Sequence, residues 1–264
     1  MKSLVDWLRT VRLPVMPEVA AKLVASYQDE QVDITYLRNV IAKDPALTAS
    51  VLRLANSPLH GLSRSVNSLD AAINLLGISK VCSQAIAICM TTAFELPKGM
   101  SRQAYWSHSM HCAGYAMWLA LAAGQDESEA WLTGMLLHLG GVLIGPLPQA
   151  DAAPANATLQ RWQAQHLAVG FDEGQVMAAV ATQWYFPPSI AHALQHSADP
   201  LNPDCLSTQA AVLHLAAMLA DLDGLDDASL ARLPAAVLSR LGLDVAWLAQ
   251  HQPDPASFTD TSML

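Results

Sequence analysis

Charged side chains are scarce in this sequence, and basic ones above all. Asp, Glu, Lys and Arg make up 14% of the 264 residues, with 14 Lys and Arg against 23 Asp and Glu and a net charge of −9. Four of the basic residues follow position 100, whereas fifteen of the acidic ones do. A nucleic-acid-binding surface needs a dense basic face that displaces counterions. The composition therefore argues against DNA or RNA as a partner and leaves open a local anion contact in the first hundred residues.

The sequence also lacks CxxC motifs, a signal-peptide pattern and apolar runs long enough to span a membrane. No two cysteines have CxxC spacing, so we expect separate buried thiols in a reducing compartment, at Cys82, Cys89, Cys112 and Cys205. The first residues lack the apolar stretch of a signal peptide. The most apolar runs, residues 81–94 and 132–147, contain polar residues and are shorter than the ~20 residues of a membrane span. We expect a cytoplasmic protein without a membrane partner.

Leu and Ala dominate what is present. Hydrophobic residues make up 52% of the chain and aromatic ones only 6%, a balance that favours helix over strand. Apolar residues recur at helical spacing, as in Leu47, Val51 and Leu54 after the helix-starting pair Asp44-Pro45. Hairpin dipeptides between alternating segments are not found. The sequence predicts an all-α, multi-helical fold.

Helix-breaking residues divide the chain. Leu96-Pro97-Lys98-Gly99 lies between long helical patterns, so we expect an N-terminal helical bundle at 1–98 and a second bundle at 99–250. Residues 251–264 are rich in Pro, Asp, Ser and Thr and are expected to form a disordered tail. Residues 151–157 are expected to form a surface loop.

The apolar stretch Gly134–Gly141 carries a single imidazole, at His138. Asp126 and Glu129 have capping-box spacing, which predicts a helix that starts there and runs into His138. Gly140 or Gly141 is expected to end that helix in the left-handed conformation. A histidine on the last turn of a buried helix can project into a bundle interior, where helical proteins often hold metals.

Four motifs carry a resemblance to a known family. They are Leu13-Pro14-x-x-Pro17-Glu18-Val19-Ala20, Asp44-Pro45-Ala46-Leu47-Thr48-x-x-Val51-Leu52-Arg53-Leu54-Ala55-Asn56-Ser57, Ser68-Leu69-x-x-Ala72-Ile73-x-x-Leu76-Gly77 and Gly134-Met135-Leu136-Leu137-His138. In this order they resemble the HDOD family, the HD-related output domains of bacterial signalling proteins, over roughly residues 10–220. The resemblance implies a helical bundle packed on an HD-like helical bundle.

The resemblance also implies a damaged metal site. HD enzymes bind cations through histidines, an adjacent His-Asp pair and a distant Asp, because the metal activates water and holds the phosphate. Carried over position by position, the relic site comprises His108, His138, Leu139 in place of the paired aspartate, Glu173 where relatives often have histidine, His196 from a histidine pair, and Ala217 at the distant aspartate. A cation that prefers oxygen has lost its main ligands. We therefore expect no resident metal, no other cofactor and no catalysis.

Two sharper interpretations of these residues stay open. His108 and Cys112 are four apart on a predicted helix and, with His138 and with or without Glu173, they could hold a softer ion such as Zn²⁺. Alternatively Cys112 and His108 could form a nucleophilic pair, although the sequence supplies no elbow, glycine loop or orienting acid for it. The plain interpretation, which we prefer, is a buried thiol among hydrogen-bonded core histidines.

Three polar residues in the first half are candidates for a partner or interdomain contact: Arg53, Asn56 and Arg64. They could bind an anion or an acidic partner. The plainer interpretation is a solvated arginine and an asparagine that ends its helix. Arg53 and Asn56 nevertheless stay candidates because they are polar residues inside a family motif, and Arg64 lies in the loop that follows it.

The function implied is non-catalytic signal transduction or regulation, through an unspecified signalling protein or a small ligand in the relic cavity. Losing metal ligands removes chemistry at little cost to the apolar faces that hold the fold. The alternative is a metal-dependent phosphohydrolase of the HD superfamily acting on nucleotides or cyclic dinucleotides. An inert ligand sensor is a third possibility.

Overall fold

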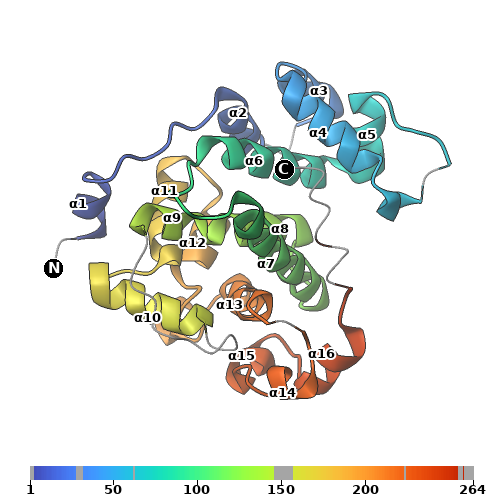
Figure 1. Ribbon diagram of the computed structural model, residues 1–264. Coiled ribbons are helices and arrows are strands. Elements are labelled where there is room, and N and C mark those ends of the chain that lie inside the picture. The colour runs from blue at the N-terminus through green and yellow to red at the C-terminus, as the bar shows by residue number, and fades with distance from the viewer. Residues whose placement is uncertain are drawn as a thin grey trace.

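The chain folds into helices (Figure 1). A computed structural model describes residues 3–27, 32–61, 63–145, 157–222, 224–254 and 258, and no β-strand occurs among them. The predicted all-α, multi-helical fold is confirmed.

Among the residues described before position 98 there are six α-helices, besides the short 3-10 helix Pro58–His60. The α-helices are α1 (Leu4–Leu8), α2 (Glu18–Ser26), α3 (Ile34–Ile41), α4 (Pro45–Ala55), α5 (Leu69–Leu76) and α6 (Ile78–Ala93). Asp44 accepts hydrogen bonds from the backbone amides of Ala46 and Leu47 at the start of α4, and Ser68 caps α5 in the same way. The side-chain caps that the sequence indicates therefore set these helix starts.

The second half begins with a long helix and continues through shorter ones. In chain order these helices are α7 (Arg102–Ala122), α8 (Glu127–Leu137), α9 (Leu139–Ile144), α10 (Ala157–Val169), α11 (Glu173–Gln183), α12 (Pro188–Gln195), α13 (Thr208–Ala220), α14 (Asp227–Leu230), α15 (Ala235–Arg240) and α16 (Val245–His251). In Figure 1, α7, α8 and α13 occupy the centre, with α3–α5 above them and α14–α16 below.

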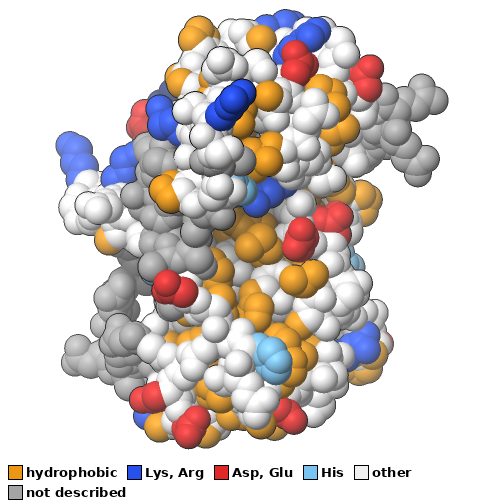
Figure 2. Space-filling view, turned by 90° about the vertical axis from the view of Figure 1, so that its right-hand side faces the viewer, with side chains coloured by type: hydrophobic (Ala, Val, Ile, Leu, Met, Phe, Trp, Pro, Cys, Tyr) orange, Lys and Arg blue, Asp and Glu red, His pale blue; other side chains and the backbone are white. Residues whose placement is uncertain are grey.

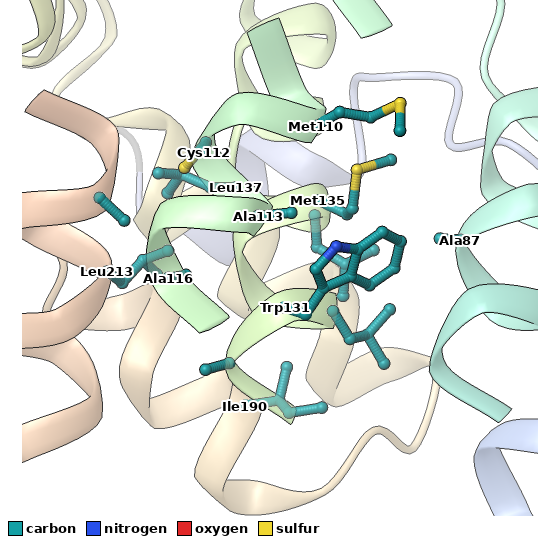
Figure 3. Packing of buried hydrophobic residues seen from close by; sticks show 14 of the residues in the cluster. Ala87, Met110, Cys112, Ala113, Ala116, Trp131, Met135, Leu137, Ile190 and Leu213 are labelled. Atoms are coloured by element: carbon teal, nitrogen blue, oxygen red, sulfur yellow. The ribbon is translucent and has the colours of Figure 1, made fainter. Parts of the chain in front are cut away.

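A continuous apolar core joins the two predicted bundles. Buried apolar residues form one cluster that includes Ala20 of α2 and Leu248 of α16. Figure 3 shows Trp131 and Met135 of α8 facing Ala87 of α6. The predicted boundary near residue 98 falls in the segment between α6 and α7. A domain boundary at that point stays a prediction. The two predicted bundles share this apolar core.

The glycine pair after His138 does not end a helix, so that expectation is wrong. A break at His138 separates α8 from α9, both glycines lie inside α9, and the left-handed residue is Gly145, with φ of 85°. The glycines instead permit close packing. A Cβ on Gly140 would lie 1.9 Å from the carbonyl oxygen of Glu173, at the start of α11.

The C-terminal residues include one packed side chain. Phe258 is 9% exposed, and its ring centroid lies 5.1 Å from that of Tyr115 on α7. The expectation of a disordered tail therefore does not hold at Phe258, because α7 offers it a small residue: a Cβ on Gly114 would overlap the Phe258 ring. Residues 255–257 and 259–264 of the expected tail, and 151–156 of the expected surface loop, lie outside the described residues.

Helix length and apolarity bear on membrane insertion. Among the residues described, no single helix is both long and apolar enough to cross a bilayer. The pair α5 and α6 would pass by length and composition if taken together, but the two helices meet at a bend of 113°.

Candidate functional site

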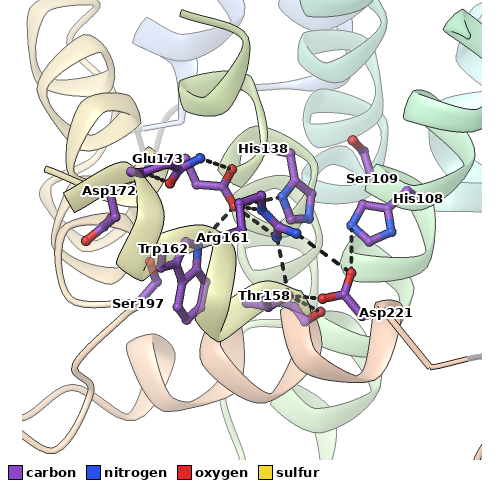
Figure 4. A network of polar contacts seen from close by, with 12 residues as sticks. His108, Ser109, His138, Thr158, Arg161, Trp162, Asp172, Glu173, Ser197 and Asp221 are labelled. Atoms are coloured by element: carbon purple, nitrogen blue, oxygen red, sulfur yellow. Dashed lines mark hydrogen bonds and ion pairs between the residues drawn. The ribbon is translucent and has the colours of Figure 1, made fainter. Parts of the chain in front are cut away.

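Polar side chains from five elements meet in the interior of the second half (Figure 4). α7, the α8–α9 junction, α10, α11 and the end of α13 each supply at least one. We call this group the charge cluster, and its members are His108, His138, Thr158, Arg161, Trp162, Gln165, Glu173 and Asp221.

Glu173 lies at the centre of the charge cluster and is 2% exposed. Its Oε1 accepts hydrogen bonds from Trp162 Nε1 at 3.0 Å and Arg161 Nε at 3.1 Å, and lies 3.1 Å from His138 Nδ1. Its Oε2 accepts from Gln165 Nε2 at 3.2 Å. Both carboxylate oxygens are thus engaged by protein groups, as a buried charge requires.

Local sequence fixes where Glu173 stands. Asp172 and Gln175 form a capping box, so Glu173 is the first residue of α11. The glycines of α9 make room for it, because a Cβ on Gly141 would lie 2.6 Å from Glu173 Oε2. A capped helix start and a glycine pair together place one carboxylate beside His138.

Arg161 connects the two carboxylates of the cluster. Its Nη2 lies 3.1 Å from Glu173 Oε1, and its Nη1 lies 3.9 Å from Asp221 Oδ1. Nη2 also donates to Thr158 Oγ1 at 3.3 Å, and that hydroxyl contacts Asp221 Oδ2. Burial alone would lower the pKa of Arg161, but Glu173 and Asp221 outweigh it and raise that pKa. The guanidinium is therefore held charged.

The pKa of Glu173 moves in the complementary direction. Burial alone would raise it, but the neighbouring Arg161 and His138 outweigh burial and hold the pKa below its usual range. Glu173 is therefore ionised at neutral pH, and the pair is a buried ion pair rather than a neutral hydrogen bond.

The two predicted histidines face each other. The ring centroids of His108 and His138 are 4.6 Å apart, and His108 Nε2 lies 3.6 Å from Asp221 Oδ1. His138 Nε2 is buried without a hydrogen-bond partner. Burial, together with nearby His138 and Arg161, lowers the pKa of His108 to about 3. His108 is therefore neutral at physiological pH.

Other implied members of the relic site lie elsewhere. Leu139 is fully buried in the apolar core. Ala217 is also buried, and the carboxylate at the end of α13 belongs to Asp221, one turn further on. The assignment of Ala217 to the family's distant aspartate stays a prediction. His196 is outside the cluster, with its ring 4.6 Å from that of His192.

Cys112 is wholly buried on α7. Burial is the main cause that raises the pKa of its thiol, so the thiolate that a nucleophile needs is disfavoured. This result argues against the nucleophilic interpretation of His108 and Cys112.

The sequence did not indicate Arg161, Trp162 or Gln165. All three lie on α10 and point their polar atoms at Glu173. The one available signal was their spacing, since Arg161 and Gln165 are four residues apart and so share a helix face. Nothing in that spacing names the carboxylate that they bind.

Asn56 and Arg64 lie apart from the charge cluster, among α3–α5. Asn56 exchanges two hydrogen bonds of 2.7 Å with the backbone of Val66 and so closes the intervening loop. A pocket of about 250 Å³ opens on that loop, lined by Asn56, Ser57, Pro58, Gly61, Arg64 and Ser65. Arg53 is exposed on α4 and donates to Ser50 Oγ at 2.8 Å.

The charge cluster does not fit the divalent cation that its family pattern implies. Leu139 has no donor atom, and the guanidinium of Arg161 lies between the carboxylates. At an effective dielectric constant near 20, two unit positive charges about 4 Å apart repel by about 4 kcal/mol. The guanidinium would repel a divalent ion at that distance more strongly still. Among the residues described, no group of three or more His, Cys, Asp or Glu is spaced to hold a metal ion.

Acid is expected to weaken the fold through His108. Its pKa is about 3 in the folded protein and about 6.5 when unfolded. The contribution of neutral His108 to the free energy of unfolding is therefore fully present above about pH 6.5. It is lost as pH falls towards the folded-state pKa, because the unfolded state binds the proton first. The His108 side chain is 31% exposed, so solvent screening keeps the slope below the full ~1.4 kcal/mol per pH unit.

Urea unfolding of the wild type and His108→Gln between about pH 7 and about pH 5 measures this effect. The variant should lose less stability over that interval. Burial raises the pKa of Asp172 to about 6, which acts with the opposite sign, so the comparison between the two proteins isolates His108. Equal slopes would contradict the assignment.

The chain is similar to one protein family and to several solved structures. The HDOD domain family model matches residues 13–200. A Shewanella amazonensis crystal structure, provisionally named a phosphohydrolase, is 25% identical, with a TM-score of 0.76 over 98% of this chain and 95% of that one. An HDOD domain protein of unknown function from Geobacter sulfurreducens is 21% identical, with a TM-score of 0.71 over 97% and 96%.

A curated relative, an uncharacterised protein of Treponema pallidum, is 20% identical over 204 residues. The match covers 72% of this chain and 40% of that protein, so the chain spans about two fifths of this relative's length.

Proposed function

The chain belongs to the HDOD family, and on that premise we propose that it is a non-catalytic signal-transduction domain that regulates a partner. The observation that carries the proposal is the state of Glu173. Three protein groups surround its Oε1 and a fourth binds its Oε2. A metal-dependent phosphohydrolase needs free ligand atoms to hold the ion that activates water. Here both carboxylate oxygens of Glu173 are occupied by protein groups.

Regulation requires a surface that a partner or a ligand can bind, and the first half of the chain has a candidate for it. Figure 2 shows most of the Lys and Arg side chains of one face in the upper part of the molecule. The pocket beside Arg64 is lined by two serines and an exposed guanidinium, a combination that suits a carboxylate or phosphate group. We place the contact with an acidic partner or a small anionic ligand here, on a loop that Asn56 holds in shape.

The alternative function is that of a phosphohydrolase. It is favoured by the retention of His108, His138 and Asp221 in one cluster, and by the provisional name of the Shewanella amazonensis protein. Under this alternative the substrate would be a nucleotide or a cyclic dinucleotide.

A turnover screen separates the two functions. Purified protein is incubated with nucleotides, cyclic dinucleotides and a generic phosphodiester, with Mn²⁺ or Mg²⁺ added. We expect no hydrolysis above buffer. Hydrolysis that disappears in His138→Ala but persists in His166→Ala, an exposed histidine on α10, would establish an enzyme and overturn the proposal.

The same ligands test the sensor possibility. A ligand that binds the native state raises the melting temperature without turnover. If the pocket beside Arg64 is the site, Arg64→Ala should abolish the rise. A rise that persists in Arg64→Ala would place the ligand elsewhere.

A further inference from the structure

The pocket beside Arg64 has a lining that narrows the choice of ligand. Among its six described lining residues none is acidic, Arg64 is the cationic one, and Ser57 and Ser65 carry hydroxyls. We infer that this pocket binds the phosphate group of a small phosphate monoester. The inference rests on the proposed function, which places an anion contact here, and it adds the class of the anion and the side chains that hold it.

The first support is an available guanidinium. Arg64 is exposed, and within the described part of the chain its side chain forms no ion pair and no hydrogen bond. Arg38 of α3, by contrast, pairs with Asp70 of α5 at 3.4 Å. A guanidinium presents parallel N–H donors that match the oxygens of an anion. Arg64 can therefore bind an anion without giving up a contact inside the protein.

The second support is a buried hydroxyl that the protein does not satisfy. Ser57 lines the pocket and is 6% exposed, and its Oγ is buried without a hydrogen-bond partner. A buried polar group in that condition costs free energy and calls for an explanation. A serine hydroxyl turns about a single bond, so Oγ can donate to an oxygen that enters the pocket. A bound anion would supply the partner that the protein does not.

The third support is the fixed shape of the loop. Asn56 Nδ2 donates to the carbonyl oxygen of Val66 at 2.7 Å, and Asn56 Oδ1 accepts from the amide of Val66 at 2.7 Å. This pair of hydrogen bonds closes the loop that carries Ser57, Arg64 and Ser65. A loop that is already ordered has less conformational entropy to lose when a ligand binds.

The number of donors favours phosphate over carboxylate. A carboxylate offers two oxygens, which the N–H groups of one guanidinium can satisfy by themselves. A phosphate monoester offers three terminal oxygens, so it can also use the hydroxyls of Ser57 and Ser65. The pocket volume of about 250 Å³ is below the ~300–1,000 Å³ of sites for drug-sized ligands. A small monoester therefore fits the pocket better than a cyclic dinucleotide does.

Phenylglyoxal, which modifies exposed guanidinium groups, tests the site in the intact protein. The rate of modification of each arginine is followed by mass spectrometry of peptides, with inorganic phosphate, glycerol 3-phosphate or acetate added at constant ionic strength. When a phosphate ligand is present at about ten times its Kd, mass action should slow the modification of Arg64 about tenfold. Acetate should protect Arg64 far less. Arg240, an exposed arginine at the end of α15, is the internal control and should keep its rate.

Two serine variants test the role of the buried hydroxyl. Ser57→Ala should raise the Kd for phosphate by about tenfold or more, because a hydrogen bond to a charged group is lost. The same variant should be no less stable than wild type in urea without phosphate, because Ser57 Oγ has no partner to lose. Ser63→Ala, an exposed serine of the same loop that is not among the lining residues, should bind phosphate as wild type does.

The inference is overturned if phosphate and glycerol 3-phosphate slow Arg64 no more than Arg240, or if acetate protects Arg64 equally well. It is also overturned if Ser57→Ala keeps the wild-type Kd. The wild-type measurement decides without the variant if Ser57→Ala does not fold. Protection by acetate alone would remove the phosphate assignment and leave the anion contact of the proposed function in place. Hydrolysis in the turnover screen would overturn the proposed function instead, so the two failures are distinguishable.

Discussion

Gly140→Ala is expected to destabilise the protein strongly. The added Cβ would lie 1.9 Å from the carbonyl oxygen of Glu173 and 2.8 Å from its carbonyl carbon. These are backbone atoms at the start of α11, so no side-chain rotation can relieve the overlap. α9 and α11 would have to separate, and Glu173 would move away from its donors.

The expected loss for Gly140→Ala is at least about 3 kcal/mol, at the upper end of overpacking because backbone must shift. That is a large share of the 5–15 kcal/mol by which domains of this kind are stable. Urea unfolding followed by circular dichroism measures it. Gly224→Ala is the matched control, since a Cβ there meets nothing within 4 Å. A Gly140→Ala protein within about 0.5 kcal/mol of wild type would contradict the packing described here.

Glu173→Gln carries the second large effect. The substitution keeps the size of the side chain and removes its charge. Arg161 then loses its closest anionic partner while His138 and Trp162 lose a charged acceptor. Breaking a buried pair from one side costs up to about 3–5 kcal/mol when the remaining charge is left uncompensated. Asp221, 3.9 Å from Arg161 Nη1, still compensates part of that charge. Exposed Glu95→Gln is the control and should change stability by less than about 0.5 kcal/mol.

The effect of Glu173→Gln should depend on pH in one direction. The pKa of Glu173 is lowered in the folded protein, since Arg161 and His138 overcome the opposing effect of burial. Its stabilisation is therefore fully present above the unfolded pKa of about 4.3 and is lost as pH falls below it. The gap between wild type and variant should narrow in acid. A gap that is constant from neutral pH to about pH 3 would mean that the charge is not what stabilises the cluster.

Local signals in the sequence account for much of the fold. Asp44 and Asp126 each cap the helix that the sequence predicts after them, because a cap is a contact between residues two or three apart. The convergence of His108 and His138 followed from the family resemblance, and the structure places their rings side by side.

Long-range contacts could not be predicted in this way. Gly140 has the same appearance in the sequence whether it ends a helix or admits a neighbouring backbone, and only the position of α11 decides between the two. Arg161 is 60 residues from Asp221, and no periodicity connects them. Asp221 caps α13 and faces His108, and it was not singled out from the sequence.

The proposed function requires that the protein's own arginine, rather than an ion, neutralises the charge cluster. Elemental analysis of the wild-type protein, purified without chelators, tests this most directly. We predict far less than one equivalent of Mn, Fe or Zn per chain, and the same low content in His138→Ala. About one equivalent in the wild type that is lost in His138→Ala would contradict the account.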